Sequence, residues 1–214
     1  MPHFVPPRRL FRALALAAAA ACLPALSAEP AYPTRPVRMV VGFPPGGSTD
    51  ALARILAPRL GEAMGQTWVV DNRGGAGGNL AAETVARAEP DGHTVFIALS
   101  TVITVNPTLY KLPFSVEKDL WPVVMLAGAQ YILVVHPSVP AKTLADLVAY
   151  AKQKPNALNY ATAGTGTPLH LAAELLKKRA GIQLTQVAYK GGGPAAASVL
   201  AGETQMIFGS FAAS

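Results

Sequence analysis

The stretch Val37–Asp50 constrains the fold most, because it has the order of a strand, a tight loop and a helix start. A Val-rich run ends at Val41, a Pro/Gly turn follows, and Ser48, Thr49 and Asp50 come next. Unpaired backbone N–H groups at such a helix start favour an anion, and glycine lets a ligand approach the backbone closely. The helix that follows is expected to bury one apolar face, which consists of Leu52, Ile55, Leu56 and Leu60.

The same kind of junction recurs along the chain. Four segments rich in Gly, Ser and Thr stand between an expected strand and an expected helix: residues 42–50, 72–79, 164–167 and 190–194. In open parallel sheets, ligands bind beyond the carboxyl ends of the strands, where such loops lie. We therefore interpret the first and third junctions as ligand-binding loops. For the second and fourth, binding and pure turn chemistry are equal alternatives.

The order of the apolar runs predicts an α/β fold with two lobes. Each lobe reads β-α-β-α-β, which favours a mostly parallel sheet flanked by helices. Residues 100–127 carry several X-Pro steps and no lasting helical period, so they are expected to connect the lobes. The expected division is a signal peptide at 1–28, a first lobe at 29–100, a connection at 101–128 and a second lobe at 129–214.

Short patterns locate the individual elements. Thr143 and Asp146 resemble a capping box, and Thr167 is expected to cap a helix that starts with Pro168. Strands are expected at residues 37–41, 68–70, 94–99, 131–135, 158–161, 186–189 and 204–208. The longer expected helices after the first one cover residues 80–88, 143–152 and 169–179.

The N-terminus has the order of a secretory signal. Arg8, Arg9 and Arg12 precede a short Ala/Leu run, and small residues up to Ala28 form the expected cleavage site. The run is too short to be a good membrane span. The single cysteine, Cys22, falls inside this signal, so the mature chain is expected to contain no disulfide. A lipoprotein attached through Cys22 is the alternative.

The charge balance argues against nucleic acid as a partner. The whole chain has a net charge of +6, which falls to +3 without the three arginines of the signal. Lysine and arginine form no clustered stripe, and they are not interleaved with aromatic residues. A mild positive surplus of this size suits a small anionic ligand.

Motifs for catalysis, nucleotides and metals are missing from the sequence. There is no Gly-x-x-x-x-Gly-Lys-Ser/Thr loop and no Gly-x-Ser-x-Gly elbow, so Ser48 is expected to be a loop or cap residue and Ser210 a surface residue. His170 and Glu174 have metal-ligand spacing but no third partner, so a structural role is favoured. Asp50 is expected to cap its helix by accepting from N–H groups two or three residues further on. We expect no cofactor, no metal and no catalysis.

Several motifs together resemble one known family, the extracytoplasmic solute receptors of tripartite tricarboxylate transporters, also called Bug proteins. The resemblance runs from about Pro36 to about Phe208. It rests on the segments Gly42–Asp50, Val70–Gly78, Pro90–Gly92, Asn106–Tyr110, Lys118–Leu120, Ala163–Thr167 and Tyr189–Gly192. It implies a monomeric periplasmic protein with a type II periplasmic-binding-protein fold, whose two lobes close over a small carboxylate. That ligand would be a di- or tricarboxylate, an amino acid or an aromatic acid, delivered to a permease with one small and one large membrane subunit.

The resemblance also implies which residues hold the ligand. On the first lobe these are Phe43, Gly46, Gly47, Ser48 and Thr49. On the second lobe they are Thr162, Gly164, Gly166, Thr167 and His170. Ser100 and Lys190 are additional candidates.

The chain departs from the family pattern in two ways. Gly209 stands where the family usually has an aspartate after the last strand. Members of the family also continue well past this point and return to complete the first lobe. The chain is therefore expected to be C-terminally truncated, with exposed apolar edges, poor solubility and weak closure.

Other functions remain open at this stage. A phosphate-using α/β enzyme would need a catalytic group at a loop, and Asp50 and Lys190 are isolated candidates. A subunit that presents its ligand to a sensory partner would use the same binding lobes. A non-functional fragment is a further alternative.

Overall fold

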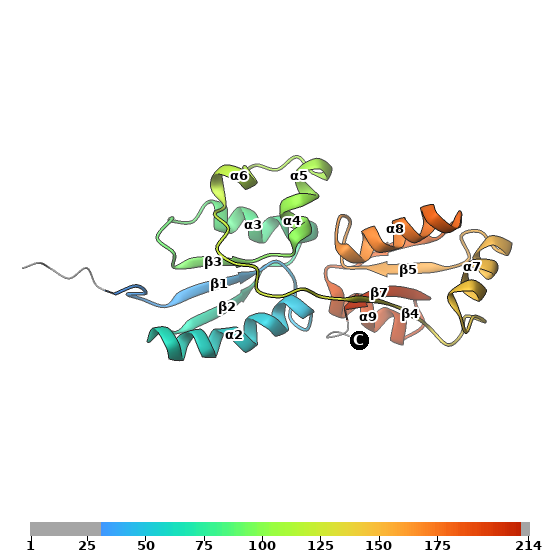
Figure 1. Cartoon of the computed structure of the whole chain (residues 1–214), viewed down its shortest axis with the longest axis horizontal. Coiled ribbons are helices and arrows are strands. Elements are labelled where there is room, and N and C mark those ends of the chain that lie inside the picture. Colours follow the sequence, from blue (N-terminus) through green and yellow to red (C-terminus); the bar gives the residue numbers. More distant parts are fainter. Residues whose placement is uncertain (1–30, 211–214) are drawn as a thin grey trace, which may run out of the picture. The chain divides into compact units, whose positions relative to one another are not determined.

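The chain has a first group of three strands and a second group of four, each with its own helices (Figure 1). The structure is a computed structural model that describes residues 31–210. The expected signal peptide and Cys22 lie outside these residues. All helices and strands named below belong to one unit that begins at Pro33. Within residues 31–210, no helix has both the length and the apolar character needed to cross a membrane.

The first sheet is entirely parallel and has the order β2-β1-β3. Its central strand is inaccessible to solvent at Val37, Val40 and Val41, because it is paired on both edges and covered on both faces. The strands are β1 (Val37–Val41), β2 (Trp68–Asn72) and β3 (Thr94–Ile97). All three were expected from the sequence, although β2 is longer and β3 shorter than predicted.

Helix α2 (Ser48–Met64) and helix α3 (Asn79–Ala86) lie on opposite faces of this sheet (Figure 1). The predicted buried face of α2 is partly wrong, since Ile55 is 57% exposed and the buried positions include Ala53 and Ala57. These alanines, four residues apart, let the helix approach the sheet closely. Pro58 lies inside α2 without ending it. Gly65 ends the helix in the left-handed conformation, and its N–H donates to Gly61 O at 3.0 Å.

Residues 100–119 are more helical than predicted. They contain three short helices, α4 (Ser100–Thr104), α5 (Asn106–Leu109) and α6 (Val116–Asp119). Helices of four or five residues are too short to show a hydrophobic period, so the sequence pattern missed them. A 3-10 turn, η1 (Ala76–Gly78), precedes α3.

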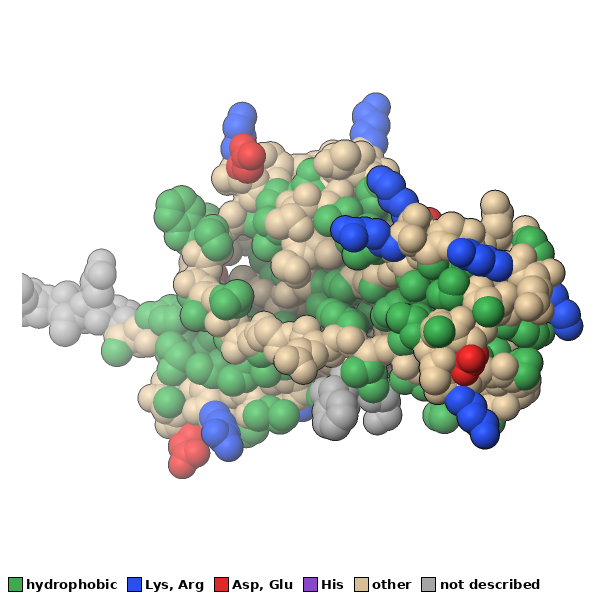
Figure 2. All heavy atoms as spheres, turned by 45° about the vertical axis from the view of Figure 1, so that its right-hand side comes forward, with side chains coloured by type: hydrophobic (Ala, Val, Ile, Leu, Met, Phe, Trp, Pro, Cys, Tyr) green, Lys and Arg blue, Asp and Glu red, His purple; other side chains and the backbone are tan. Residues whose placement is uncertain are grey.

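Residues 120–130 form no regular element, and their apolar side chains reach solvent. Trp121, Val123 and Met125 are all at least 86% exposed. On the face drawn in Figure 2, hydrophobic side chains reach the surface, and Lys and Arg side chains stand mostly apart from one another.

The second sheet has the order β4-β7-β5-β6, with β4 antiparallel to β7 and the other pairs parallel. Its core gathers around Tyr160, Leu147 and Met206, each no more than 2% exposed. The strands are β4 (Tyr131–Val135), β5 (Asn159–Thr162), β6 (Thr185–Ala188) and β7 (Met206–Ser210).

The helices of the second group are α7 (Leu144–Gln153), α8 (Pro168–Ala180) and α9 (Gly192–Leu200). The capping box at α7 is confirmed, because Thr143 accepts from the Asp146 N–H and the Asp146 carboxylate accepts from the Thr143 N–H. Thr167 stands at the N-cap of α8, but its hydroxyl donates to Gly164 O at 2.6 Å instead of capping the helix.

Candidate functional site

A cavity of about 140 Å³ lies where elements of both sheets end. Phe43, just after β1, and Ala163, just after β5, both line it. The start of α2 contributes Gly47, Ser48 and Thr49, and the start of α9 contributes Gly192. Apolar side chains such as Leu169, Val199 and Ile207 complete much of the wall. The cavity therefore joins two of the glycine-rich junctions to the ends of two parallel strands, the place where α/β sheets bind ligands.

The backbone at the start of α2 is arranged to offer N–H groups. Gly47 is extended, and the first hydrogen bond of the helix joins the Ala51 N–H to Gly47 O at 3.0 Å. The N–H groups of Ser48, Thr49 and Asp50 thus precede the hydrogen-bond pattern of the helix itself. Gly46 has φ +90, which an L side chain rarely adopts, so the turn requires glycine there.

Asp50 binds the backbone of this loop. The prediction that Asp50 caps α2 by accepting from N–H groups two or three residues further on is wrong. Its carboxylate accepts from the N–H of Gly46, four residues earlier, at 3.0 Å. It also accepts from Arg54 Nε at 3.0 Å and from Asn72 Nδ2 at 3.0 Å. Asn72 Nδ2 donates in addition to Phe43 O at 2.9 Å, so the network spans the whole loop. The Gly46 N–H is engaged by Asp50 and faces a carboxylate instead of an outside anion.

The charge of Asp50 is stable at neutral pH. Burial by itself would raise the pKa of Asp50, but hydrogen bonds from Arg54, Gly46 and Asn72 outweigh it and hold the pKa below its ordinary value. The carboxylate is only 4% exposed and pairs with the Arg54 guanidinium. Its charge is therefore largely compensated beside the cavity.

The polar groups of the loop between β5 and α8 bind one another. Thr162 Oγ1 accepts from Gln186 Nε2 at 3.0 Å and from the Gly164 N–H at 3.3 Å. The Gly166 N–H donates to His170 Nδ1 at 3.3 Å. Together with the Thr167–Gly164 bond, these contacts fix the shape of the loop, so its side chains act in positioning the backbone.

His170 is neutral in this arrangement. Because Nδ1 accepts a hydrogen bond, the neutral ring carries its proton on Nε2, which lies 4.0 Å from Glu174 Oε1. Burial lowers the pKa of His170, and this outweighs the attraction of Glu174. Glu174 is occupied by Tyr160 and by Lys177 Nζ at 2.7 Å. No group of three or more metal-ligating side chains occurs among residues 31–210.

The four glycine-rich junctions meet in two pairs. The second and third meet where a Cβ added to Gly77 would lie 3.1 Å from Thr165 O; Tyr110, just after α5, donates to the same oxygen at 2.9 Å. The first and fourth meet where a Cβ added to Gly191 would lie 2.9 Å from Pro44 Cδ. Such close approach leaves no room for side chains at these glycines.

The predicted ligand-binding residues fall into three groups. Four of them line the cavity: Phe43, Gly47, Ser48 and Thr49. Gly46 and the residues of the third junction support the adjoining loops: Thr162, Gly164, Gly166, Thr167 and His170. Ser100, the first residue of α4, and Lys190 are exposed and do not line the cavity.

Apart from Phe43, sequence reasoning missed the apolar part of the site, because it searched the loops for polar groups. Ala163 and Leu169 lie inside or beside the third junction and line the cavity, whereas their polar neighbours do not. Apolar residues that flank a glycine loop were the available signal. Ser210 was expected at the surface, but it is 6% exposed at the end of β7 and lines the cavity.

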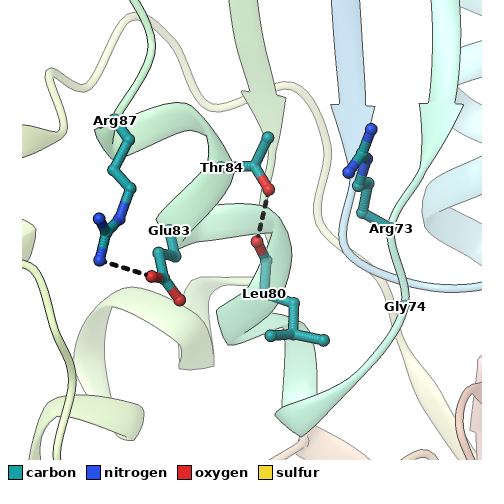
Figure 3. Close-up of a pocket in the computed structure, with 6 residues that line it drawn as sticks. All are labelled: Arg73, Gly74, Leu80, Glu83, Thr84 and Arg87. Carbon is teal, nitrogen blue, oxygen red and sulfur yellow. Dashed lines mark hydrogen bonds and ion pairs between the residues drawn. The ribbon is translucent and has the colours of Figure 1, made fainter.

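A second pocket lies between α3 and the segment just after β2 (Figure 3). Its charged groups have partners: Glu83 pairs with Arg87 at 2.8 Å, and Arg73 donates to Asp71 at 3.1 Å. Thr84 donates to Leu80 O at 2.8 Å. Each charged group of this pocket is thus engaged by a neighbouring residue, and we assign no function to the pocket.

Comparison with known proteins now decides the family. A model of the family described as "Tripartite tricarboxylate transporter family receptor" matches residues 52–214. The chain belongs to this family. Two curated relatives agree. A protein from the tcbD-tcbE intergenic region of Pseudomonas sp. (strain P51) is 39% identical over 95% of this chain and 60% of its own length. BugT of Bordetella pertussis is 37% identical over 91% of this chain and 60% of its own length.

Solved structures show the family fold. A "periplasmic transporter" has a TM-score of 0.82 and 39% identity over 86% of this chain and 62% of its own. Rpa4515 of R. palustris, solved with adipate, has a TM-score of 0.81 and 38% identity over 84% and 60%. MatC of Rhodopseudomonas palustris, with bound malate, has a TM-score of 0.77 and 31% identity over 84% and 61%. The Bug-family resemblance and the periplasmic-binding-protein-like fold are thus confirmed, and this family member spans about 60% of the length of the relatives it matches.

Proposed function

We propose that this chain is a periplasmic receptor that captures a small carboxylate and delivers it to a transporter with one small and one large membrane subunit. It binds its ligand as a monomer and without catalysis. Its lobes correspond to residues 29–100 and 129–214, joined by residues 101–128. The observation that carries the proposal is the cavity lined by the starts of α2 and α9 and by the ends of β1 and β5.

The electrostatics of this cavity favour a negative ligand. The first turn of a helix carries partial positive charge, which stabilises an adjacent anion by about 0.3–1 kcal/mol. The starts of α2 and α9 both contribute lining residues. Hydrogen bonds from N–H groups to a charged acceptor each contribute roughly 1.5–3 kcal/mol. Two helix starts and the hydroxyls of Ser48 and Thr49 are sufficient to bind a carboxylate without a cationic side chain.

Each predicted residue takes a role in this proposal. Phe43, Gly47, Ser48 and Thr49 contact the ligand. Gly46 keeps the first loop in place through Asp50. The loop between β5 and α8 keeps its shape through Thr162, Gly164, Gly166, Thr167 and His170. Ser100 and Lys190, which are exposed and do not line the cavity, are assigned no contact with the ligand. The relatives solved with adipate and with malate support a carboxylate as the ligand class.

Calorimetric titration with matched pairs of carboxylic acids and their primary amides tests the proposal. The amide keeps the shape of the acid and removes its charge, so it should bind at least 10-fold more weakly. The panel contains malate, adipate, glutamate and benzoate. A chain that unfolds cooperatively but binds none of these acids would contradict the proposal.

A further inference from the structure

The polar groups of the cavity lie at the helix starts and at Ser210, the last residue of β7. Its N–H groups and its threonine hydroxyl come from the starts of α2 and α9. These two helix starts adjoin each other, because a Cβ added to Gly193 would lie 3.5 Å from Gly46 O. Thr49 is 8% exposed, and its hydroxyl makes no hydrogen bond within residues 31–210. The polar groups are therefore gathered where one carboxylate can reach them.

Apart from Ser210, the rest of the wall is hydrophobic. It includes Phe43, Leu99, Tyr131, Leu169, Val199 and Ile207, and no Lys, Arg or His is among the lining residues. Burial raises the pKa of Tyr131, so its phenol stays neutral. A second carboxylate on the same ligand would be removed from water against these side chains. Burying a charge without a partner is strongly unfavourable.

We propose that the preferred ligand is a monocarboxylate with a ring-sized apolar body, such as an aromatic acid. Its carboxylate binds at the start of α2, and its ring fills the space between Leu169, Val199 and Ile207. This inference rests on the proposed receptor function and specifies the ligand class. The volume agrees: the cavity measures about 140 Å³, and an apolar cavity of roughly 150 Å³ binds benzene.

Calorimetry on the 214-residue chain tests the ligand class, with benzoate, benzamide, malate and adipate as probes. Benzoate should bind at least 10-fold more tightly than malate or adipate, and benzamide at least 10-fold more weakly than benzoate. If malate or adipate binds as tightly as benzoate, the aromatic assignment is overturned and the carboxylate receptor stands. If no acid binds to the folded chain, both proposals fail.

Neighbouring alanines on α9 provide a matched pair of variants. Ala196 lines the cavity, whereas Ala197 is exposed. Ala196→Phe fills the cavity and should lower the affinity for benzoate more than 10-fold, while Ala197→Phe should leave it within 2-fold. Equal affinities in the two variants would overturn the assignment, provided that both unfold cooperatively in urea.

An enlarged cavity gives a second test that does not depend on Ala196→Phe folding. Val199 lines the cavity and is 3% exposed. Val199→Ala removes two methyl groups from the wall, so the ratio of 2-naphthoate affinity to benzoate affinity should rise at least 5-fold. An unchanged ratio would show that the ring does not occupy this cavity.

Discussion

The carboxylate of Asp50 accepts a hydrogen bond from the backbone N–H of Gly46 at 3.0 Å, and it thereby closes the loop that begins the proposed ligand site. Asn72 Nδ2 donates both to the Asp50 carboxylate and to Phe43 O, so the same network reaches the first residues of the loop. Asp50 thus fixes the conformation of the loop. This conformation determines how the N–H groups at the start of α2 are presented to a ligand.

Replacing Asp50 should destabilise the chain. Asp50→Ala leaves the Gly46 N–H and the Asn72 amide without their acceptor, and the loss of hydrogen bonds to a buried charged group costs about 2–3 kcal/mol. Urea unfolding measures the loss. Glu83→Ala is the control, because it breaks only the exposed pair with Arg87 and should cost roughly 0.3–0.5 kcal/mol. Equal losses in the two variants would show that the network does not hold the loop.

The stability of the chain should depend on pH through His170. Burial lowers the pKa of His170 in the folded chain below its unfolded value near 6.5. The neutral ring therefore contributes stability that is present above pH 6.5 and is lost as the pH falls through the lower folded pKa. Protonated Nδ1 can no longer accept from the Gly166 N–H. Glu174 and Lys177, both on α8, act on the ring in opposite senses, so burial sets the direction.

Urea unfolding from pH 7.5 to pH 5 measures this dependence. The free energy of unfolding should fall less steeply in His170→Gln than in the parent chain. An identical slope in the two chains would contradict the role of His170.

Gly166 should tolerate no side chain. Its φ is +83, and an added Cβ would lie 2.8 Å from Asn106 Oδ1 and 3.0 Å from Leu109 Cδ1. Gly181 also has a positive φ, of +63, but nothing lies within 4 Å of an added Cβ. Gly181→Ala should therefore cost about 1 kcal/mol for the backbone conformation alone. Gly166→Ala should cost more in thermal unfolding, and an equal cost would show that this loop does not touch α5 there.

A proline at position 48 should remove a ligand-binding N–H while keeping the helix. Ser48 is the first residue of α2, a position that tolerates proline, and the extended Gly47 before it is compatible with a following proline. Ser48→Pro should weaken carboxylate binding by about 1.5–3 kcal/mol, whereas Ser48→Ala keeps the N–H and should lose less. Calorimetry compares them, and parent-like affinity in Ser48→Pro would contradict the site.

Regular elements with strong local signals could be predicted from the sequence, and features set by tertiary packing could not. The strand at Tyr131–Val135 and the capping box at Thr143 follow from residues close together in the chain. Ile55 was assigned to the buried face because it is apolar, but the sheet selects Ala53 and Ala57 for close approach. The bond from Gly46 to Asp50 also depends on Asn72 and Arg54, and a local capping rule does not include them.

The candidate site also has one part that could be predicted from the sequence and another that depends on tertiary packing. The glycine-rich pattern predicted the first junction as a ligand-binding loop, and the family resemblance implied its individual residues, among them Phe43, Ser48 and Thr49. The apolar wall of the cavity comes from separate elements, for example Tyr131 on β4 and Val199 on α9, so no single segment of the sequence predicts it. Only the folded chain brings these side chains to one cavity.

Amide NMR during a titration with benzoate tests the central claim most directly. The account predicts that the N–H resonances of Ser48 and Thr49 shift downfield as a carboxylate accepts from them, and that benzamide leaves them in place. The claim would be contradicted if benzoate bound and these two resonances did not move, while those around Arg73 and Arg87 did.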